Sequence, residues 1–257
     1  MDLKGLLNGV KRLLLVLLAA DALLLAALGA LRWQGLLLLP DEAAPEQWEV
    51  FGVDVSAYQG EVDWVRLAEQ GVDFTFIKAT EGSGLQDRWF AANWAGAASA
   101  GIRAGAYHFF SYDSPGLTQA ENFIRTVPAH PDMLPPVVDL EFYGSYLKQP
   151  LERGQVRAIL DPLLTALEGH YGVKPILYVT YRSYYRYLAG GEYGAYPIWC
   201  SSPIIFPLTP GWQFWQYSHS ARLEGYSGSE ERIDLNVFQG SKAEFDAFGR
   251  PVSHEKA

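Results

Sequence analysis

Two carboxylates close an apolar run in the stretch PPVVDLEFYG at residues 135–144. Asp139 and Glu141 are separated by one leucine. Alternate residues of a β-strand share a face, so both side chains point the same way, about 6–7 Å apart along the backbone. Two acids on one face of a hydrophobic strand are costly to bury unless something uses them. The pair is therefore the first candidate for chemistry.

Two more acids, Asp54 and Asp234, occur in the apolar runs FGVDVS and RIDLNVF. Cleaving a glycosidic bond requires a proton for the leaving oxygen and negative charge beside an oxocarbenium-like centre. Two carboxyl groups in different surroundings supply both. An apolar neighbour such as Phe142 raises the pKa of one acid, while polar neighbours keep another ionised. The four acids together therefore indicate a hydrolytic site.

Further polar and aromatic residues stand near the ends of the predicted strands, where flat rings stack on sugars and polar tips bind hydroxyls. Some of them have a structural alternative: Lys78 as the partner of an acid, His108 as a hydrogen-bonded core residue, and Trp215 as plain core. The candidate substrate-binding residues are Tyr58, Lys78, Glu81, Tyr107, His108, Tyr178, Trp215, Gln216 and Tyr217.

The elements that position these residues follow an alternating pattern. Strand-like runs such as FTFIKAT (74–80) and PILYVT (175–180) alternate with helical segments such as 63–70, 87–100 and 151–169. This alternation predicts parallel strands with crossover helices, and in barrels of this kind the active site lies at the C-terminal ends of the strands. After residue 190, YPIWCSS, WQFWQYS and RIDLNVF predict strands joined by short loops with little helix.

The N-terminus carries a membrane signal. Residues 13–31 read LLLVLLAADALLLAALGAL and follow Lys4, Lys11 and Arg12. The length fits a bilayer span better than the core of a cleaved signal peptide. Asp21 costs about 2.5–3.5 kcal/mol in mid-membrane, and the leucines offset it. The positive-inside rule places the basic start in the cytoplasm and the rest of the chain outside.

These features predict five segments. They are a cytoplasmic basic segment at 1–12, a transmembrane signal anchor at 13–39, a linker at 40–50, a barrel domain at 51–250 and a tail at 251–257. The prediction is a single-pass cell membrane protein with an extracytoplasmic catalytic domain. Cleavage of the N-terminal segment is the alternative, and it would secrete the domain.

Composition excludes several other functions. The chain has 257 residues and a net charge of −9, so it lacks the basic face that nucleic acids require. Cys200 is the only cysteine, which rules out an intrachain disulfide, and we interpret it as a small buried hydrophobe. The five histidines form no HExxH motif or close pair, so we expect no metal site and no cofactor.

Six motifs, taken in order, resemble the family 25 glycoside hydrolases, the lysozymes of the Chalaropsis type. They are FGVDVSAYQG, FTFIKATEG, GAYHFF, PPVVDLEF, FWQYS and IDLNVF, spread from about Phe51 to Gly240. The resemblance implies an α/β fold: a modified TIM-like (β/α) barrel of eight strands with a reduced set of helices. It also implies an N-acetylmuramidase that hydrolyses the β-1,4 bond between N-acetylmuramic acid and N-acetylglucosamine in peptidoglycan.

The same resemblance implies roles for the acids. Glu141 matches the proton donor, and Asp139 matches its partner, which in the family either stabilises and orients the substrate's own 2-acetamido group as that group attacks or acts more directly. Asp54 and Asp234 match acids that line the same pocket. The run IWCSSP at 198–203 departs from the family's usual LWIA, which puts one edge of the groove in question.

Two other functions remain open from the sequence. One is a barrel that binds peptidoglycan without cleaving it, although such a binder needs no proton donor. The other is a hydrolase of a different N-acetylated glycan such as chitin. The expected partners are peptidoglycan strands, and the membrane through the N-terminal helix, with a monomeric catalytic domain.

Overall fold

The computed structural model describes residues 3–38, 47–203 and 205–250. The chain divides into two compact units, Met1–Leu38 and Leu39–Ala257. The predicted tail at 251–257 and most of the predicted linker, residues 40–46, lie outside the described residues.

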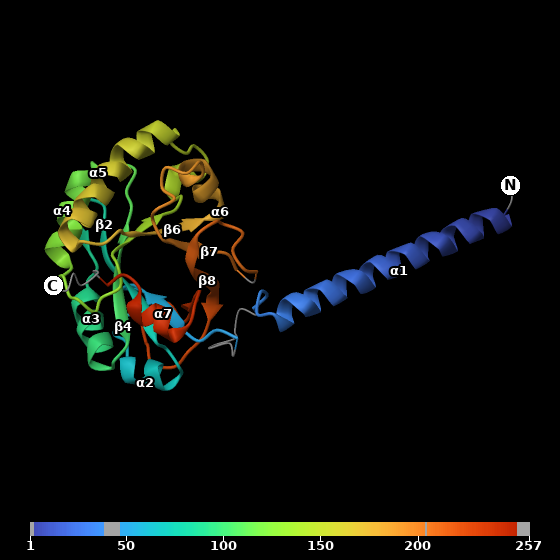
Figure 1. Ribbon diagram of the computed structural model, residues 1–257, viewed down its shortest axis with the longest axis horizontal. Helices are drawn as coiled ribbons and strands as arrows, with labels where there is room; N and C mark the ends of the chain where they lie inside the picture. The colour runs from blue at the N-terminus through green and yellow to red at the C-terminus, as the bar shows by residue number, and fades with distance from the viewer. Residues whose placement is uncertain (1–2, 39–46, 204, 251–257) are drawn as a thin grey trace, which may run out of the picture. The chain divides into compact units, whose positions relative to one another are not determined.

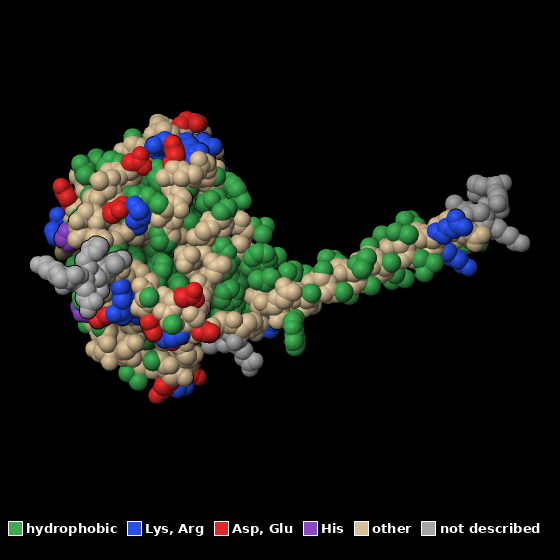
Figure 2. Space-filling view, viewed as in Figure 1, with side chains coloured by type: hydrophobic (Ala, Val, Ile, Leu, Met, Phe, Trp, Pro, Cys, Tyr) green, Lys and Arg blue, Asp and Glu red, His purple; other side chains and the backbone are tan. Residues whose placement is uncertain are grey.

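The first unit is the helix α1 (Leu3–Trp33). Its stretch Leu7–Trp33, 27 residues, is long and apolar enough to cross a membrane, and Figure 2 shows apolar side chains along its length with basic ones near its start. The predicted transmembrane segment, 13–39, overlaps this stretch but does not share its bounds. The helix begins at Leu3 and ends at Trp33, because Gly35 adopts a left-handed φ of 68° and closes the last turn.

The second unit is a closed barrel (Figure 1). Its nine strands run in the order β1-β9-β8-β7-β6-β5-β4-β2-β3, and β1 also pairs with β2, so eight strands form the ring and β3 extends β2. The eight-stranded modified barrel is confirmed. The strands are β1 (Phe51–Val55), β2 (Phe74–Glu81), β3 (Leu85–Gln86), β4 (Arg103–Phe109), β5 (Val137–Leu140), β6 (Ile176–Thr180), β7 (Ile198–Ser201), β8 (Trp212–Ala221) and β9 (Ile233–Phe238).

The ring is not wholly parallel. Strands β1, β2 and β4 to β8 run parallel to their neighbours, whereas β9 is antiparallel to both β8 and β1. The C-terminal ends of the parallel strands therefore meet the N-terminal end of β9. Asp234, near the start of β9, pairs in register with Asp54 of β1, and both reach the same end of the barrel.

The helices are concentrated in the first two-thirds of the domain. Figure 1 shows them on the outside of the ring. They are α2 (Trp64–Glu69), α3 (Phe90–Ser99), α4 (Gly116–Thr126), α5 (Arg153–Tyr171), the single turn α6 (Tyr181–Ser183), α7 (Lys242–Ala247), and the short segments η1 (Gly144–Leu147) and η2 (Tyr184–Leu188). The described residues of the β7–β8 and β8–β9 connections contain no helix, as the resemblance implies.

Local sequence explains the helix ends. Asp63 caps α2 by accepting the Arg66 amide at 3.0 Å. A capping box of Glu152 and Gln155 starts α5, and Gly172 with φ 71° ends it. Helices α4 and α5 pack closely at Gly116, where a Cβ would come within 1.9 Å of the Ile159 carbonyl oxygen.

The barrel interior is filled by aromatic and aliphatic side chains. Phe76 stacks on Trp199 with ring centroids 4.4 Å apart and lies 5.1 Å from Phe214. The buried cluster consists of Val50, Phe74, Phe76, Leu134, Val137, Ile176, Tyr178, Trp199, Phe214, Phe238 and Phe245. This apolar cluster fills the barrel interior.

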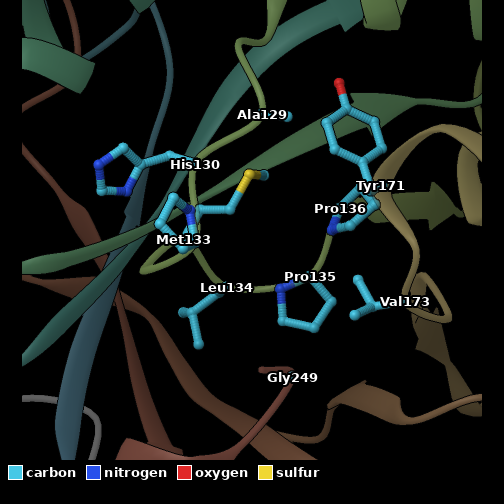
Figure 3. A pocket seen from close by; sticks show the side chains of 10 residues that line it. Ala129, His130, Met133, Leu134, Pro135, Pro136, Tyr171, Val173 and Gly249 are labelled. Carbon is cyan, nitrogen blue, oxygen red and sulfur yellow. The ribbon is translucent and has the colours of Figure 1, made fainter. Parts of the chain in front are cut away.

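A small cavity of about 190 Å³ lies at the opposite end, where the chain enters β5 (Figure 3). Met133, Leu134, Pro135, Pro136 and Val173 form much of its lining, and the lining contains no carboxyl group. It therefore lacks the acids that the sequence analysis singled out.

Candidate active site

A cavity of about 530 Å³ opens at the end of the barrel where the parallel strands finish. Its lining includes Asp54, Asp139, Glu141 and Asp234. The structure thus brings together four acids from three strands that are far apart in sequence. It also places five predicted substrate-binding residues in the lining: Tyr58, Lys78, Tyr107, Tyr178 and Gln216.

Asp54 and Asp234 form a carboxyl pair across β1 and β9. Two amide groups donate to Asp54 Oδ2, Asn236 Nδ2 at 2.7 Å and Gln216 Nε2 at 3.0 Å. Burial raises the pKa of Asp54, and these donors and Asp234 oppose that rise. Burial, repulsion from Asp54 and the hydrogen bond to Asp54 raise the pKa of Asp234 to about 9. Asp54 is therefore the more acidic member, and Asp234 keeps the shared proton.

Asp139 and Glu141 form the second acid pair, at the end of β5. Asp139 is 7% exposed, and its Oδ1 atom has no hydrogen-bond partner among the described residues. Burial raises the pKa of Asp139 well above its usual range, and repulsion from Glu141 adds to this. Burial also raises the pKa of Glu141, with a contribution from Asp54. The pair therefore retains a proton at a pH where isolated carboxyls have lost theirs.

The positive charge of Lys78 acts on both members of this pair: it lowers the pKa of Asp139 and the pKa of Glu141. Its Nζ atom bonds Glu81 Oε2 at 2.7 Å and lies 4.8 Å from the centre of the Phe109 ring. Lys78 therefore lines the cavity and forms an ion pair at once. Glu81 lies outside the lining, and its charge adds to the rise in the pKa of Asp139.

Besides Glu81, three predicted substrate-binding residues do not line the cavity. His108, Trp215 and Tyr217 are fully buried. His108 bonds Thr80 Oγ1 at 2.7 Å and Gln119 Oε1 at 2.9 Å, and the Trp215 indole donates to the Ser202 carbonyl at 2.7 Å. The reason is strand parity: Tyr107 and Gln216 face the barrel interior, so their immediate neighbours face outward.

Sequence reasoning missed several residues of the lining. Trp199 has a detectable signal, since it stands two residues before Ser201 and shares its face of β7. Glu230 and Arg232 depend on a loop whose path the local sequence does not predict, whereas His219 lies in β8 and Gln59 follows β1. The missed lining residues include Gln59, Trp199, His219, Glu230 and Arg232.

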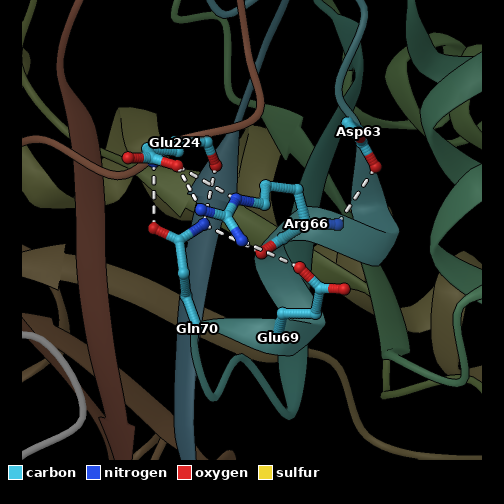
Figure 4. A network of polar contacts seen from close by, with 5 residues as sticks. All are labelled: Asp63, Arg66, Glu69, Gln70 and Glu224. Atoms are coloured by element: carbon cyan, nitrogen blue, oxygen red, sulfur yellow. Dashed lines mark hydrogen bonds and ion pairs between the residues drawn. The ribbon is translucent and has the colours of Figure 1, made fainter.

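The loop that carries Glu230 and Arg232 is residues 222–232, between β8 and β9 (the β8–β9 loop). Figure 4 shows its attachment to α2: Arg66 pairs with Glu224 and with Glu69, and Gln70 Nε2 bonds the Glu224 carbonyl at 2.7 Å. This exposed network positions the loop more than it stabilises the fold.

The same loop touches the β1–α2 connection beside the cavity. Gln59 Nε2 donates to the Arg232 carbonyl at 3.0 Å, and the Glu230 amide donates to the Tyr58 carbonyl at 3.0 Å. A Cβ on Gly228 would come within 2.0 Å of the Tyr58 carbonyl oxygen. The close approach of the two backbones therefore requires glycine at 228.

The described residues contain no group of three His, Cys, Asp or Glu side chains arranged to hold a metal ion. Cys200 is buried, as interpreted, and its thiol lies 3.3 Å from Thr209 Oγ1. Burial raises the pKa of this thiol to about 11, so it remains protonated at neutral pH.

Comparison with known proteins identifies the family to which this domain is related. Residues 53–226 match the model of the glycosyl hydrolases family 25. A solved family 25 glycosyl hydrolase from Bacillus anthracis shares 45% identity and a TM-score of 0.76, covering 81% of this chain and 97% of that one. Lysozyme M1 from Streptomyces globisporus is 33% identical over 82% of this chain and 76% of its own length.

A more distant relative is the N,O-diacetylmuramidase of Arthroderma benhamiae, which is 27% identical over 78% of this chain and 87% of its own length. The domain that carries the acids therefore resembles family 25 hydrolases both in sequence and in fold. The chain belongs to glycosyl hydrolase family 25 and is a glycoside hydrolase.

Proposed function

We propose that the chain is a muramidase, a lysozyme that hydrolyses the β-1,4 bond between N-acetylmuramic acid and N-acetylglucosamine in peptidoglycan. Family membership and the relatives named lysozyme and muramidase support this substrate. The observation that carries the proposal is the cavity of about 530 Å³ with two carboxyl pairs, which has room for sugar rings and a source of protons.

Glu141 is the proposed proton donor. It is the less buried acid of its pair, it lines the open cavity, and burial raises its pKa, so it holds a proton for the leaving oxygen. After the glycosidic bond breaks, the Glu141 carboxylate takes a proton from the water that attacks the anomeric carbon.

Asp139 is proposed to orient the substrate's 2-acetamido group. Asp139 lines the cavity, and its carboxylate is an acceptor for the acetamido N–H of a bound sugar. This bond turns the acetamido carbonyl oxygen toward the anomeric carbon, where it displaces the leaving group. Asp54 and Asp234 complete the catalytic set by supplying one negative charge beside the developing cation.

The remaining lining supplies substrate contacts. The rings of Tyr58, Tyr107 and Tyr178 offer stacking faces and hydroxyls, while Lys78 and Gln216 offer N–H donors. His108, Trp215 and Tyr217 are buried outside this lining, so the proposed set of substrate contacts does not include them.

We propose that α1 anchors this hydrolase in the cell membrane, with the barrel domain (51–250) and its peptidoglycan partner on the extracytoplasmic side. The length and composition of Leu7–Trp33 and the basic residues Lys11 and Arg12 support this orientation. A signal sequence has the same properties, and its cleavage would release the domain. A membrane tether raises the local concentration of the enzyme at the wall. We also propose that the catalytic domain acts as a monomer, because one barrel contains all four acids.

The decisive experiment digests purified peptidoglycan with the full chain in detergent micelles and identifies the products by mass spectrometry. Muropeptides with N-acetylmuramic acid at the reducing end would establish the proposed bond. The Glu141→Gln variant should lose about 10²–10⁴-fold in kcat, whereas Glu121→Gln, an exposed acid on α4, should retain activity.

Three outcomes would contradict the proposal. Undiminished cleavage by Glu141→Gln would remove its proton donor. Tight binding of muropeptides by the wild type without any cleavage would indicate a binding barrel. Cleavage of chitin oligosaccharides with no action on peptidoglycan would indicate a different glycan.

A further inference from the structure

Beneath the acids lies a chain of buried hydrogen bonds that the proposed reaction does not explain. The Trp199 indole Nε1 donates to Asn236 Oδ1 at 2.8 Å, and Asn236 Nδ2 donates to Asp54 Oδ2 at 2.7 Å. On the other side, the Tyr178 hydroxyl donates to Gln216 Oε1 at 2.8 Å, and Gln216 Nε2 donates to Asp54 Oδ2 at 3.0 Å. Two amide side chains thus connect two aromatic residues to the Asp54 carboxylate, and Gln216 Nε2 also lies 3.1 Å from Asp234 Oδ2.

The aromatic residues fix which way the amides point. An indole N–H is only a donor, so the Asn236 atom that faces it must be the oxygen, and the nitrogen is left to face Asp54. Trp199 itself is held in place, because it is 2% exposed and packs between Phe76, at 4.4 Å between centroids, and Tyr178, at 4.5 Å. Without this indole, rotation of the amide by 180° would present its oxygen to the carboxylate.

We propose that Trp199 and Tyr178 are positioning residues: each bonds the oxygen of one amide side chain and thereby turns its nitrogen toward Asp54. The inference rests on the proposed muramidase function for its catalytic consequence. Trp199 has the larger effect, since a tyrosine hydroxyl also accepts hydrogen bonds and constrains Gln216 less strictly.

The amide nitrogens stabilise Asp54 as a carboxylate among many other charges. The other titratable groups that line the same cavity are Asp234 from β9, His219 from β8, Asp139 from β5 and Glu141 just after it, Tyr178 from β6, Lys78 from β2, Tyr107 from β4, Tyr58 after β1, and Glu230 and Arg232 from the β8–β9 loop. Trp199→Phe changes none of these groups. A change in the titration of Asp54 would therefore report the amide orientation.

The test compares the pH dependence of kcat/KM on peptidoglycan for the full chain and its Trp199→Phe variant. Loss of one charge-assisted hydrogen bond should move the acidic limb of the profile up by about one pH unit. The matched control is Trp64→Phe, another buried indole that bonds an asparagine oxygen, Asn93 Oδ1, but one that has no carboxylate behind it. Its acidic limb should stay in place.

Two further variants keep the test decisive if Trp199→Phe folds poorly. Asn236→Ala should move the acidic limb at least as far, and Tyr178→Phe should move it less. In the Asn236→Ala background, Trp199→Phe should cause no additional shift, because the indole acts only through that amide.

Titration of Asp54 by the 13C chemical shift of its carboxyl group provides a readout that needs no activity. Its midpoint should rise in Trp199→Phe and not in Trp64→Phe. If the wild type fails to cleave peptidoglycan, the proposed function is wrong, and this titration still decides the positioning role. Equal Asp54 midpoints in wild type and Trp199→Phe, or additive shifts with Asn236→Ala, would overturn the inference.

Discussion

Replacing Asp234 by asparagine should stabilise the barrel. Asp234 shares a proton with Asp54, and its pKa is raised to about 9 by burial, by repulsion from Asp54 and by their hydrogen bond. In the unfolded chain the same carboxyl ionises near 3.9. An asparagine at 234 still offers an N–H to Asp54 and carries no proton to lose, so the variant preserves the contact and removes the titration.

The sign follows from proton linkage. Between about pH 4 and pH 9 the folded wild type holds a proton on Asp234 that the unfolded chain has released. The contribution of Asp234 to stability is therefore complete below pH 4 and declines as the pH rises, by at most about 1.4 kcal/mol per pH unit for one proton. Asp54 and Asp234 titrate as a coupled pair, so only part of this loss belongs to Asp234. We expect the free energy of unfolding of Asp234→Asn to exceed that of the wild type by about 1–2 kcal/mol at pH 7.

The assay is urea unfolding of the full chain in mild detergent, followed by tryptophan fluorescence at pH 4 and pH 7. The gain of the variant should be largest at pH 7 and near zero at pH 4. Asp246→Asn, an exposed acid on α7, should change stability by less than about 0.5 kcal/mol at both values. A variant that is less stable than wild type at pH 7, or a gain of equal size at pH 4, would refute the shared-proton assignment.

Two other substitutions test how the surroundings of the site are built. His108→Leu leaves Thr80 and Gln119 without their buried hydrogen-bond partner, so the free energy of unfolding should fall by about 2–3 kcal/mol. KM at 25 °C should stay within about two-fold of the wild-type value. A large rise in KM would indicate that His108 contributes to substrate binding. Gly228→Ala forces the β8–β9 loop away from the Tyr58 carbonyl, so KM should rise several-fold. Gly84→Ala, which has open space around it, should change nothing, and equal KM values for the two alanine variants would contradict the role of the loop.

The meeting of the four acids could be predicted because it depends on rules that act along the whole chain. Parallel strands connected by helices place their C-terminal ends together, so Asp54, Asp139 and Glu141 had to approach one another. Asp234 does not follow this rule, because its strand is antiparallel to both of its neighbours. It lies near the start of an antiparallel strand, and only the closure of β9 between β8 and β1 brings it opposite Asp54.

The face of each side chain was predictable in principle and was misassigned in practice. Trp215, Gln216 and Tyr217 are consecutive, so a strand cannot direct all three into one groove. The aromatic types of the outer two suggested sugar stacking, yet their rings pack against the outside of the barrel wall, with Trp48 5.8 Å from Trp215 between centroids. An aromatic side chain serves core and site equally well, so residue type cannot replace parity.

Other features were beyond local sequence. The contribution of Glu230 and Arg232 depends on the path of the β8–β9 loop, which contacts with α2 and with the β1–α2 connection determine. Those contacts join residues more than 150 positions apart, such as Gln70 and Glu224. A single sequence contains no local signal for pairings of this separation.

Burial is the largest cause of the raised pKa values of the four acids Asp54, Asp139, Glu141 and Asp234, which links the walls of the site to its chemistry. The Trp199–Phe76 stack closes the cavity from below and the β8–β9 loop closes it from the side. Any change that admits more water past either wall lowers all four pKa values together. Glu141 then loses its proton at a lower pH, and the basic limb of activity moves down even though no acid has been replaced. The proton supply of the site therefore depends on how well apolar and loop contacts exclude water, and not on the acids alone.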